Sequence, residues 1–297
     1  MSLPQPPTSP ITQVCYRHPQ REAGRQCTRC GKPACSDCLV QVSVGSHCVD
    51  CIKAAKPDIK TKAKYWNAGQ HSLVTFSLIA ANVAVFILLV VIDSRALGGN
   101  VTRGTADLGL NKSLLRNGAR YGDHIYPPHQ WFRLLTSGFI HFGIFHLAMN
   151  MFALYQLGQM LERSMGRSRF ALLYFAGLFG GSLGSLLLER SPGSISGGAS
   201  GAIFALLAAA AVGLQRQGVN VMRTSIGSTL AINLLITFAI PFISIGGHLG
   251  GATAGAICGL VLLAPHWKPM PKWAHYATPL ALIAISVLGS VLVVGSA

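Results

Sequence analysis

The stretch LVTFSLIAANVAVFILLVVI, residues 73–92, is a run of twenty residues without a charged side chain, and Asp93 ends it. An α-helix needs about 20 apolar residues to cross the hydrocarbon core of a bilayer. The composition agrees with a membrane protein, because 51% of the 297 residues are hydrophobic and only 11% are charged. An ordinary soluble domain has roughly 25% charged residues. The stretch therefore predicts the first of several membrane-spanning helices.

Six further segments without Lys, Arg, Asp or Glu follow the first one. They lie at residues 134–161, 170–188, 200–214, 226–245, 247–263 and 277–297. The fourth and sixth predicted spans are short and rich in small residues, which suits helices that are enclosed by other helices. The sequence therefore predicts an all-α polytopic membrane protein with seven spans. Residues 266–297 are expected to form a loop followed by the seventh span.

The Lys and Arg residues are concentrated on one set of loops, as cytoplasmic loops are. They precede the first predicted span and follow the second, fourth and sixth: Lys53, Lys56, Lys60, Lys62, Lys64; Arg163, Arg167, Arg169; Arg216, Arg223; Lys268 and Lys272. The segment 93–133 is also basic, but long segments cross a membrane with little regard to charge. We therefore expect a plasma-membrane protein with a cytoplasmic N-terminus and an outer C-terminus. The net charge of +15 is then explained by basic loops on the cytoplasmic side of the lipid bilayer. No nucleic-acid partner is expected.

Residues 1–71 differ in composition from the rest of the chain. Residues 1–10 have neither the basic region nor the apolar region of a secretory signal, which indicates a disordered lead. Residues 11–53 contain seven of the eight cysteines, and residues 54–71 form a predicted basic linker.

Segment 11–53 contains four pairs of Cys or His residues with two residues between the members of each pair. They are Cys15 and His18, Cys27 and Cys30, Cys35 and Cys38, and Cys48 and Cys51. This spacing lets both side chains of a pair bind one tetrahedral zinc ion, so eight ligands suffice for two structural ions. A module held by disulfides is the alternative, but thiols stay reduced in the cytoplasm, where the topology puts this segment. His47 could replace Cys48 as a ligand.

Five polar residues in the predicted spans stand out: His141, His146, Asn150, Ser200 and His248. Polar and ionisable residues inside a membrane are costly, so each is a functional candidate. The predicted orientation puts all five near the outer ends of their helices. A serine and a histidine at one depth fit a nucleophile and its general base. His146 and Asn150 are four residues apart and share a helix face, so both could donate hydrogen bonds to an oxyanion.

Other interpretations of these residues exist. His141 lies about 140° from His146 on a regular helix and is expected to brace the outer end. Ser200 could be a small-residue helix contact, and His248 could be a satisfied polar residue between helices. The nucleophile turn of soluble hydrolases is disfavoured, since Ala202 occupies its second glycine position. A proton-coupled transporter is disfavoured because intramembrane acids and inverted repeats are lacking.

Four motifs lie between residues 72 and 265: Trp131-Phe132-Arg133, His141-x4-His146-x3-Asn150, Gly198-Ala199-Ser200-Gly201 and Gly247-His248-x2-Gly251-x3-Gly255. With these motifs, residues 72–265 resemble the rhomboid family of intramembrane serine proteases. The resemblance implies a six-helix core, a Ser–His dyad without a cofactor, and cleavage of single-span membrane proteins near the outer membrane face. The seventh span resembles the extra C-terminal helix of larger members.

The resemblance assigns roles to particular residues. It makes Ser200 the nucleophile and His248 the general base, with His146, Asn150 and the Ser200 backbone N–H as the oxyanion hole. Arg133 and Glu162 look structural. Phe204 departs from the family pattern, because many members have a tyrosine there. The alternative within the family is a non-catalytic protein that binds or retains membrane proteins.

Segment 11–53 resembles the B-box and related small zinc-binding domains. In these domains the ligand pairs are often used crosswise, the first with the third and the second with the fourth. The resemblance itself implies metal binding. Four ligands per ion leave no open position for water, so we expect the zinc to be structural. A cytoplasmic protein is the expected partner of this domain.

Overall fold

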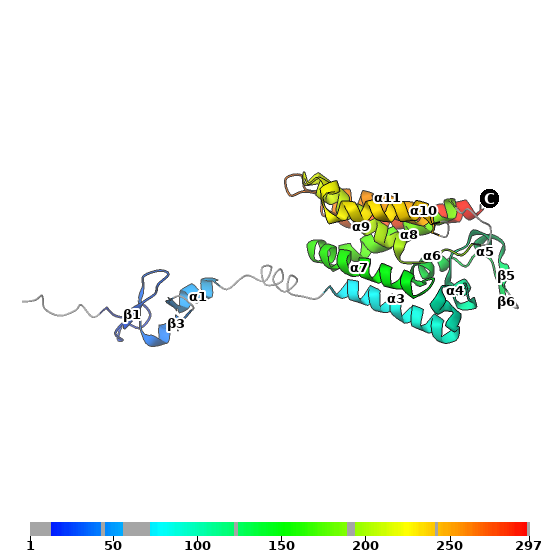
Figure 1. Cartoon of the computed structure of the whole chain (residues 1–297). Coiled ribbons are helices and arrows are strands. Elements are labelled where there is room, and N and C mark those ends of the chain that lie inside the picture. Colours follow the sequence, from blue (N-terminus) through cyan, green and yellow to red (C-terminus); the bar gives the residue numbers. More distant parts are fainter. Residues whose placement is uncertain are drawn as a thin grey trace, which may run out of the picture. The chain divides into compact units, whose positions relative to one another are not determined.

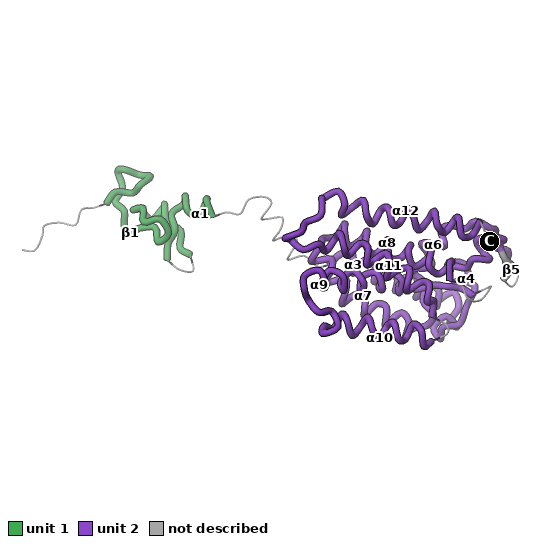
Figure 2. The backbone as a smooth tube through the Cα atoms, turned by 90° about the horizontal axis from the view of Figure 1, so that it is seen from above, with its two compact units in different colours: residues 1–69 green, residues 70–297 purple. Residues whose placement is uncertain are grey.

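The computed structural model describes residues 13–42, 45–55, 72–121, 124–188, 194–240 and 243–295. The chain forms two compact units, Met1–Gly69 and Gln70–Ala297 (Figure 2). The predicted lead at residues 1–10 and most of the predicted linker, residues 56–71, lie outside the described residues.

The first unit contains short elements around buried cysteines. Two two-stranded antiparallel sheets pair β1 (Arg25–Gln26) with β2 (Pro33–Ala34) and β3 (Leu39–Gln41) with β4 (Ser46–Cys48), and η1 (Ser36–Cys38) and α1 (Val49–Ala55) complete the unit. Its buried apolar residues are Cys15, Cys27, Ala34, Cys35, Cys38 and Cys48. A core of this size is too small to hold a domain together, so an additional cross-link is needed.

The second unit is built from seven long helices in the part of the chain that is described, lying alongside one another (Figure 1). They are α3 (Leu73–Ile92), α7 (Ile144–Met165), α8 (Arg167–Leu187), α9 (Ser200–Arg216), α10 (Ser225–Ala239), α11 (Ile245–Leu262) and α12 (Ala274–Gly295). Each corresponds to one predicted span. By length and composition α3, α8, α11 and α12 qualify as membrane spans on their own, while α9 and α10 are apolar but shorter. The chain is a polytopic all-α membrane protein.

Shorter elements connect the long helices. Between α3 and α7 lie η2 (Ser94–Gly98), α4 (Arg103–Leu108), α5 (Lys112–Asn117), β5 (Ala119–Tyr121), β6 (His124–Tyr126), α6 (Arg133–Thr136) and η3 (Ser137–Phe139), and η4 (Val221–Arg223) precedes α10. The strands β5 and β6 form an antiparallel hairpin.

The second predicted span is broken, so the prediction of one continuous helix over residues 134–161 was wrong. η3 ends at Phe139, α7 begins at Ile144, and the two parts differ in direction by 94°. Gly143 lies at the break and has a φ of 89°. Residues other than glycine rarely adopt this backbone conformation, because their Cβ atom disfavours it. A Cβ on Gly143 would also lie 3.2 Å from the backbone nitrogen of Gly99. The chain therefore turns sharply where an uncharged sequence gave no sign of a break.

Arg133 anchors the segment between α3 and α7. Its buried guanidinium donates to the carbonyl oxygens of Ala106, at 2.5 Å, and Gly109, at 2.8 Å, and lies 5.2 Å from the ring centroid of Tyr126. The Tyr126 hydroxyl donates to Asp107 at 2.7 Å. Burial and this hydrogen bond raise the pKa of Tyr126 to about 12. These contacts fit the structural role that the family resemblance implied for Arg133.

Glu162 joins the C-terminal part of α7 to the start of α3. Its carboxylate accepts hydrogen bonds from the backbone nitrogens of Val74, at 3.0 Å, and Thr75, at 2.8 Å, and from the Thr75 hydroxyl, at 2.7 Å. The first N–H groups of a helix have no partner within that helix. A buried carboxylate therefore satisfies the N-terminus of α3.

Glycines let α11 approach α9 closely. A Cβ on Gly251 would clash with the backbone of Gly201, and a Cβ on Gly255 would clash with the backbone of Ala205. Such close approach maximises van der Waals contact between helices where no hydrophobic effect drives their association. The contact fixes the first turns of α9 and α11, where the candidate site lies.

Candidate active site

Ser200 and His248, which are 48 residues apart in the sequence, form a hydrogen-bonded pair. The Nε2 atom of His248 lies 2.8 Å from the Oγ atom of Ser200. Ser200 is the first residue of α9, and His248 lies in the first turn of α11, where the Ser244 side chain caps the helix by accepting a bond from the Gly247 nitrogen at 3.1 Å. His248 is buried, and Ser200 is partly accessible. The pair has the geometry of a nucleophile and a general base.

Phe204 packs on the ring of His248. The two rings are stacked, with their centroids 4.1 Å apart and their planes inclined by 18°. Phe204 lies one turn after Ser200, and its side chain covers one face of the imidazole.

Thr237 is a neighbour of His248 that the sequence reasoning missed. Its hydroxyl oxygen, on α10, lies 2.7 Å from the Nδ1 atom of His248, and both side chains are buried. A threonine side chain is not ionisable, so Thr237 was not considered as a candidate. The sequence feature that could have indicated it is a polar side chain in the span immediately before the helix of His248.

His146 lies beside Ser200, in the first turn of α7. The backbone nitrogen of Phe142 donates to His146 Nδ1 at 3.3 Å, so the proton of the neutral ring is on Nε2. A Cβ built on Gly198 would lie 3.0 Å from that Nε2 atom and 3.7 Å from Ser200 Oγ. The His146 Nε2–H is therefore a donor close to the Ser200 hydroxyl.

Asn150 lies one turn after His146, and both side chains line one large cavity. Its Nδ2 donates one hydrogen bond to the His146 carbonyl oxygen at 2.8 Å. An amide nitrogen has two N–H donors, so one remains for a ligand. The structure thus brings together four of the five candidates: Ser200, His248, His146 and Asn150 line one cavity of about 1370 Å³.

His141 is the candidate that the structure places differently. It lies in the break before α7, so the angular offset of 140° expected on a regular helix was wrong. Its ring is fully buried and meets the His146 ring edge-on, with centroids 5.1 Å apart. It contacts a site residue instead of lining the large cavity.

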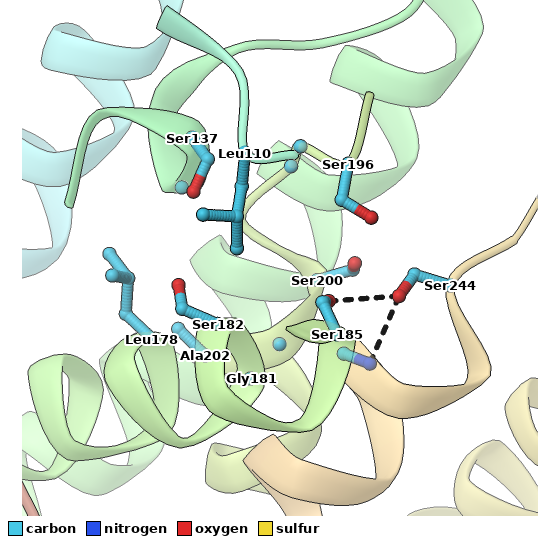
Figure 3. Close-up of a pocket in the computed structure, with 15 residues that line it drawn as sticks. Leu110, Ser137, Leu178, Gly181, Ser182, Ser185, Ser196, Ser200, Ala202 and Ser244 are labelled. Atoms are coloured by element: carbon cyan, nitrogen blue, oxygen red, sulfur yellow. Dashed lines mark hydrogen bonds between the residues drawn. The ribbon is translucent and has the colours of Figure 1, made fainter. Parts of the chain in front are cut away.

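A second, smaller cavity of about 40 Å³ lies beside Ser200 and is lined by hydroxyl groups (Figure 3). Its serines are Ser137, Ser182, Ser185, Ser196, Ser200 and Ser244. The hydroxyls of Ser185 and Ser244 are hydrogen-bonded to each other at 2.9 Å. A cavity of this volume that hydroxyl groups line in part is large enough for one water molecule, which hydrolysis needs.

The first unit contains two clusters of possible metal ligands. One cluster joins Cys15, His18, Cys35 and Cys38, and the other joins Cys27, Cys30, Cys48 and Cys51; the ligand atoms within each lie within 4.8 Å of one another. This is the crosswise pairing that the B-box resemblance implied. His47 belongs to neither cluster in the described part of this unit.

The geometry of both clusters fits a tetrahedral ion. Cys30 Sγ lies 3.7 Å from Cys48 Sγ, and His18 Nδ1 lies 3.4 Å from Cys38 Sγ. Two sulfurs bound to one zinc ion are separated by about 3.8 Å. The backbone nitrogen of Cys48 also donates to Cys27 Sγ at 3.2 Å, which favours a thiolate.

Comparison with known proteins finds one family model and several relatives. The family model described as "Rhomboid domain" matches residues 128–265. The chain is 32% identical to "Rhomboid protease GluP" of Bacillus subtilis (strain 168), over 77% of this chain and 42% of that protein. It is 30% identical to "RHOMBOID-like protein 6, mitochondrial" of Arabidopsis thaliana, over 68% of this chain and 71% of that protein.

Other relatives extend the comparison. "RHOMBOID-like protein 1" of Arabidopsis thaliana is 33% identical over 63% of this chain and 52% of that protein, and "Inactive RHOMBOID-like protein 8" of the same plant is 37% identical over 48% of this chain and 42% of that protein. The chain spans about half the length of GluP and of RHOMBOID-like protein 1. The seven helices, the pair at the start of α9 and α11, and these relatives together show that the chain belongs to the rhomboid family.

Proposed function

We propose that this protein is an intramembrane serine endopeptidase that cleaves single-span membrane proteins. The observation that carries the proposal is the distance of 2.8 Å between Ser200 Oγ and His248 Nε2 inside a membrane unit. Polar and ionisable side chains inside a membrane are energetically costly, so such a pair is a functional candidate. Relatives that are named as rhomboid proteases support the same activity.

In the proposed reaction, Ser200 Oγ attacks the carbonyl carbon of the scissile peptide bond. The hydroxyl proton moves to His248 Nε2 as the carbon–oxygen bond forms. His248 then gives this proton to the leaving amine nitrogen, and the C–N bond breaks. In the second half, His248 takes a proton from a water molecule, whose oxygen attacks the ester carbonyl carbon. The bond from that carbon to Ser200 Oγ then breaks, and His248 returns the proton to Ser200 Oγ.

The oxyanion of the tetrahedral intermediate needs donors that are in place before the reaction. His146 Nε2–H, the free N–H of Asn150 and the backbone N–H of Ser200 are the proposed donors. The last of these belongs to the N-terminus of α9, where the helix dipole favours negative charge.

The depth of the site indicates where substrates are cut. Ser200, His248 and His146 all lie in the first turns of their helices. With the N-terminus in the cytoplasm, as the distribution of Lys and Arg favours, these turns face the outer side. We propose a multi-pass plasma-membrane location and cleavage near the outer face, where the ends of substrate helices unwind most readily.

The test is cleavage of a single-span model protein by the purified chain in liposomes. We expect Ser200→Ala and His248→Ala each to abolish product formation. The matched control is Ser290→Ala, which removes a hydroxyl that bonds to the Ser286 carbonyl oxygen within α12. Equal cleavage by Ser200→Ala would refute the proposal. Binding of the model protein without cleavage by the unsubstituted chain would favour the non-catalytic alternative.

We also propose that the two Cys/His clusters hold structural zinc ions. Four protein ligands per ion leave no open position for a water molecule, so these ions would supply stability and no chemistry. The small unit that they hold together would then be free to bind a cytoplasmic protein partner.

A further inference from the structure

We propose that Thr237 is a positioning residue that holds His248 in the tautomer required of a general base. The inference rests on the proposed function and deepens it. Thr237 lies on α10, a helix separate from those that carry Ser200 and His248. It is fully buried, with an exposed fraction of 0%.

The directions of three consecutive hydrogen bonds follow from the groups involved. Thr237 Oγ1 lies 2.6 Å from the carbonyl oxygen of Asn233, which can only accept, so the hydroxyl proton points there. The Thr237 oxygen is then left to accept from His248 Nδ1, at 2.7 Å. His248 therefore carries its proton on Nδ1.

The position of that proton decides whether His248 can act. A neutral imidazole has one N–H, so protonation of Nδ1 leaves a lone pair on Nε2. That lone pair faces Ser200 Oγ at 2.8 Å and can accept the hydroxyl proton. In the other tautomer, Nε2 would be a donor and could not take the proton.

The same contact helps after proton transfer. The imidazolium then carries a proton on each nitrogen, and Nδ1–H still donates to the Thr237 oxygen. A hydrogen bond from a charged donor is stronger than one from a neutral donor. Thr237 thus performs, without a charge, the orienting task of a third member in a catalytic triad.

The packing of α10 makes this contact specific. Of the residues Ser225–Ala239, only Gly227 and Thr237 are buried, and α10 otherwise presents exposed apolar residues such as Ile232 and Leu235. Thr237 is therefore the buried residue of α10 that contacts the general base, His248.

The test compares three variants of the full chain in liposomes. Thr237→Val keeps the shape of the side chain but loses the hydroxyl, and Thr237→Ser keeps the hydroxyl. Thr253→Val is the matched control, because the Thr253 hydroxyl donates to the Leu249 carbonyl oxygen on the exposed face of α11. We measure kcat and KM for a single-span substrate and the ¹⁵N chemical shifts of the His248 ring, assigned with His248→Gln.

We expect Thr237→Val to lower kcat about tenfold with KM unchanged, because one positioned hydrogen bond is lost from the chemical step. Thr237→Ser and Thr253→Val should keep kcat within about twofold of the original value. The ¹⁵N shifts should report protonated Nδ1 in the unsubstituted chain and a mixture of tautomers in Thr237→Val. Should Thr237→Val not fold, Thr237→Ala is compared with Thr237→Ser by the same two measurements.

The outcomes separate this inference from the proposed function. An active unsubstituted chain with unchanged kcat and tautomer in Thr237→Val overturns the inference and leaves the protease in place. A chain that cleaves nothing overturns the proposed function. The ¹⁵N shifts still decide the role of Thr237 in that case, since identical tautomers in both proteins would refute it.

Discussion

At the scale of single residues, Asn150 is a sharp test of the proposed oxyanion hole. It uses one amide N–H for the His146 carbonyl oxygen, so a single N–H is left for the substrate. Loss of one such donor costs about 10²- to 10³-fold in kcat. We expect Asn150→Ala to lower kcat by this factor with little change in KM, as measured by initial rates over a range of substrate concentrations. An unchanged kcat would remove Asn150 from the hole.

Individual residues were predictable where their chemistry is rare inside a membrane. Ser200 and His248 were found because the charges of the loops put them at the same depth, independently of any motif. Thr237 was missed because hydroxyl side chains are common in spans, and Ser200 stood out only because histidines lay at the same predicted depth. The predicted position of His141 relative to His146 was wrong, because the prediction assumed a regular helix through a segment that contains Gly143.

At the scale of elements, Glu162 links two helices, and its removal should destabilise the membrane unit. The carboxylate accepts three hydrogen bonds from the first turn of α3 while itself being buried. Hydrogen bonds to charged groups are worth roughly 1.5–3 kcal/mol each. We expect Glu162→Ala to lower the free energy of unfolding in detergent by about 2–4 kcal/mol, measured by denaturant titration.

Two milder substitutions calibrate that effect. Glu162→Gln keeps one acceptor oxygen and should lose less stability than Glu162→Ala. Thr75→Val removes a single bond and should lose the least. A Glu162→Ala protein as stable as the original chain would show that this link contributes nothing to stability.

The elements themselves were largely predictable, and their interruptions were not. Each long helix corresponds to a predicted uncharged segment, because the bilayer requires a nearly continuous apolar run for each span. The break of 94° before α7 was invisible for the same reason, since both sides of it are apolar. Composition defines the length of an apolar segment and says nothing of a bend within it.

At the scale of the whole molecule, metal removal should affect one unit and spare the other. The first unit has a core made almost wholly of cysteines, and the second has extensive packing of its own. We expect a chelator to release two zinc ions per reduced chain and to make residues 13–55 sensitive to protease. Cleavage of a membrane substrate should persist. Elemental analysis and limited proteolysis measure the two effects.

Two neighbouring residues provide the matched comparison. Cys48→Ser alters a cluster ligand and should reduce the zinc content to one ion, while His47→Ala, next to it and outside both clusters, should retain two. A reduced protein without zinc would contradict the metal assignment. Lost cleavage in an intact membrane unit would show instead that the two units are functionally coupled.

The division into two units was visible in the sequence because the cysteines and the apolar runs do not overlap. The predicted orientation in the membrane rests on the Lys and Arg counts alone. The crosswise use of the four ligand pairs could not be derived from their spacing, since any two pairs supply four ligands for a tetrahedral ion.

The contact between Gly251 and the backbone of Gly201 has a consequence for how this gene can change. Gly201 follows the nucleophile directly, and Gly251 lies three residues after the base, so a single added methyl group would push the two reactive side chains apart. A mutation to alanine at Gly251 therefore acts on catalysis although it alters no reactive atom. Surveys of random variants under selection for cleavage should find this codon as intolerant as those of Ser200 and His248. Exposed residues of α10 that do not line the cavity, such as Ile232 and Leu235, should be replaced readily by other apolar residues.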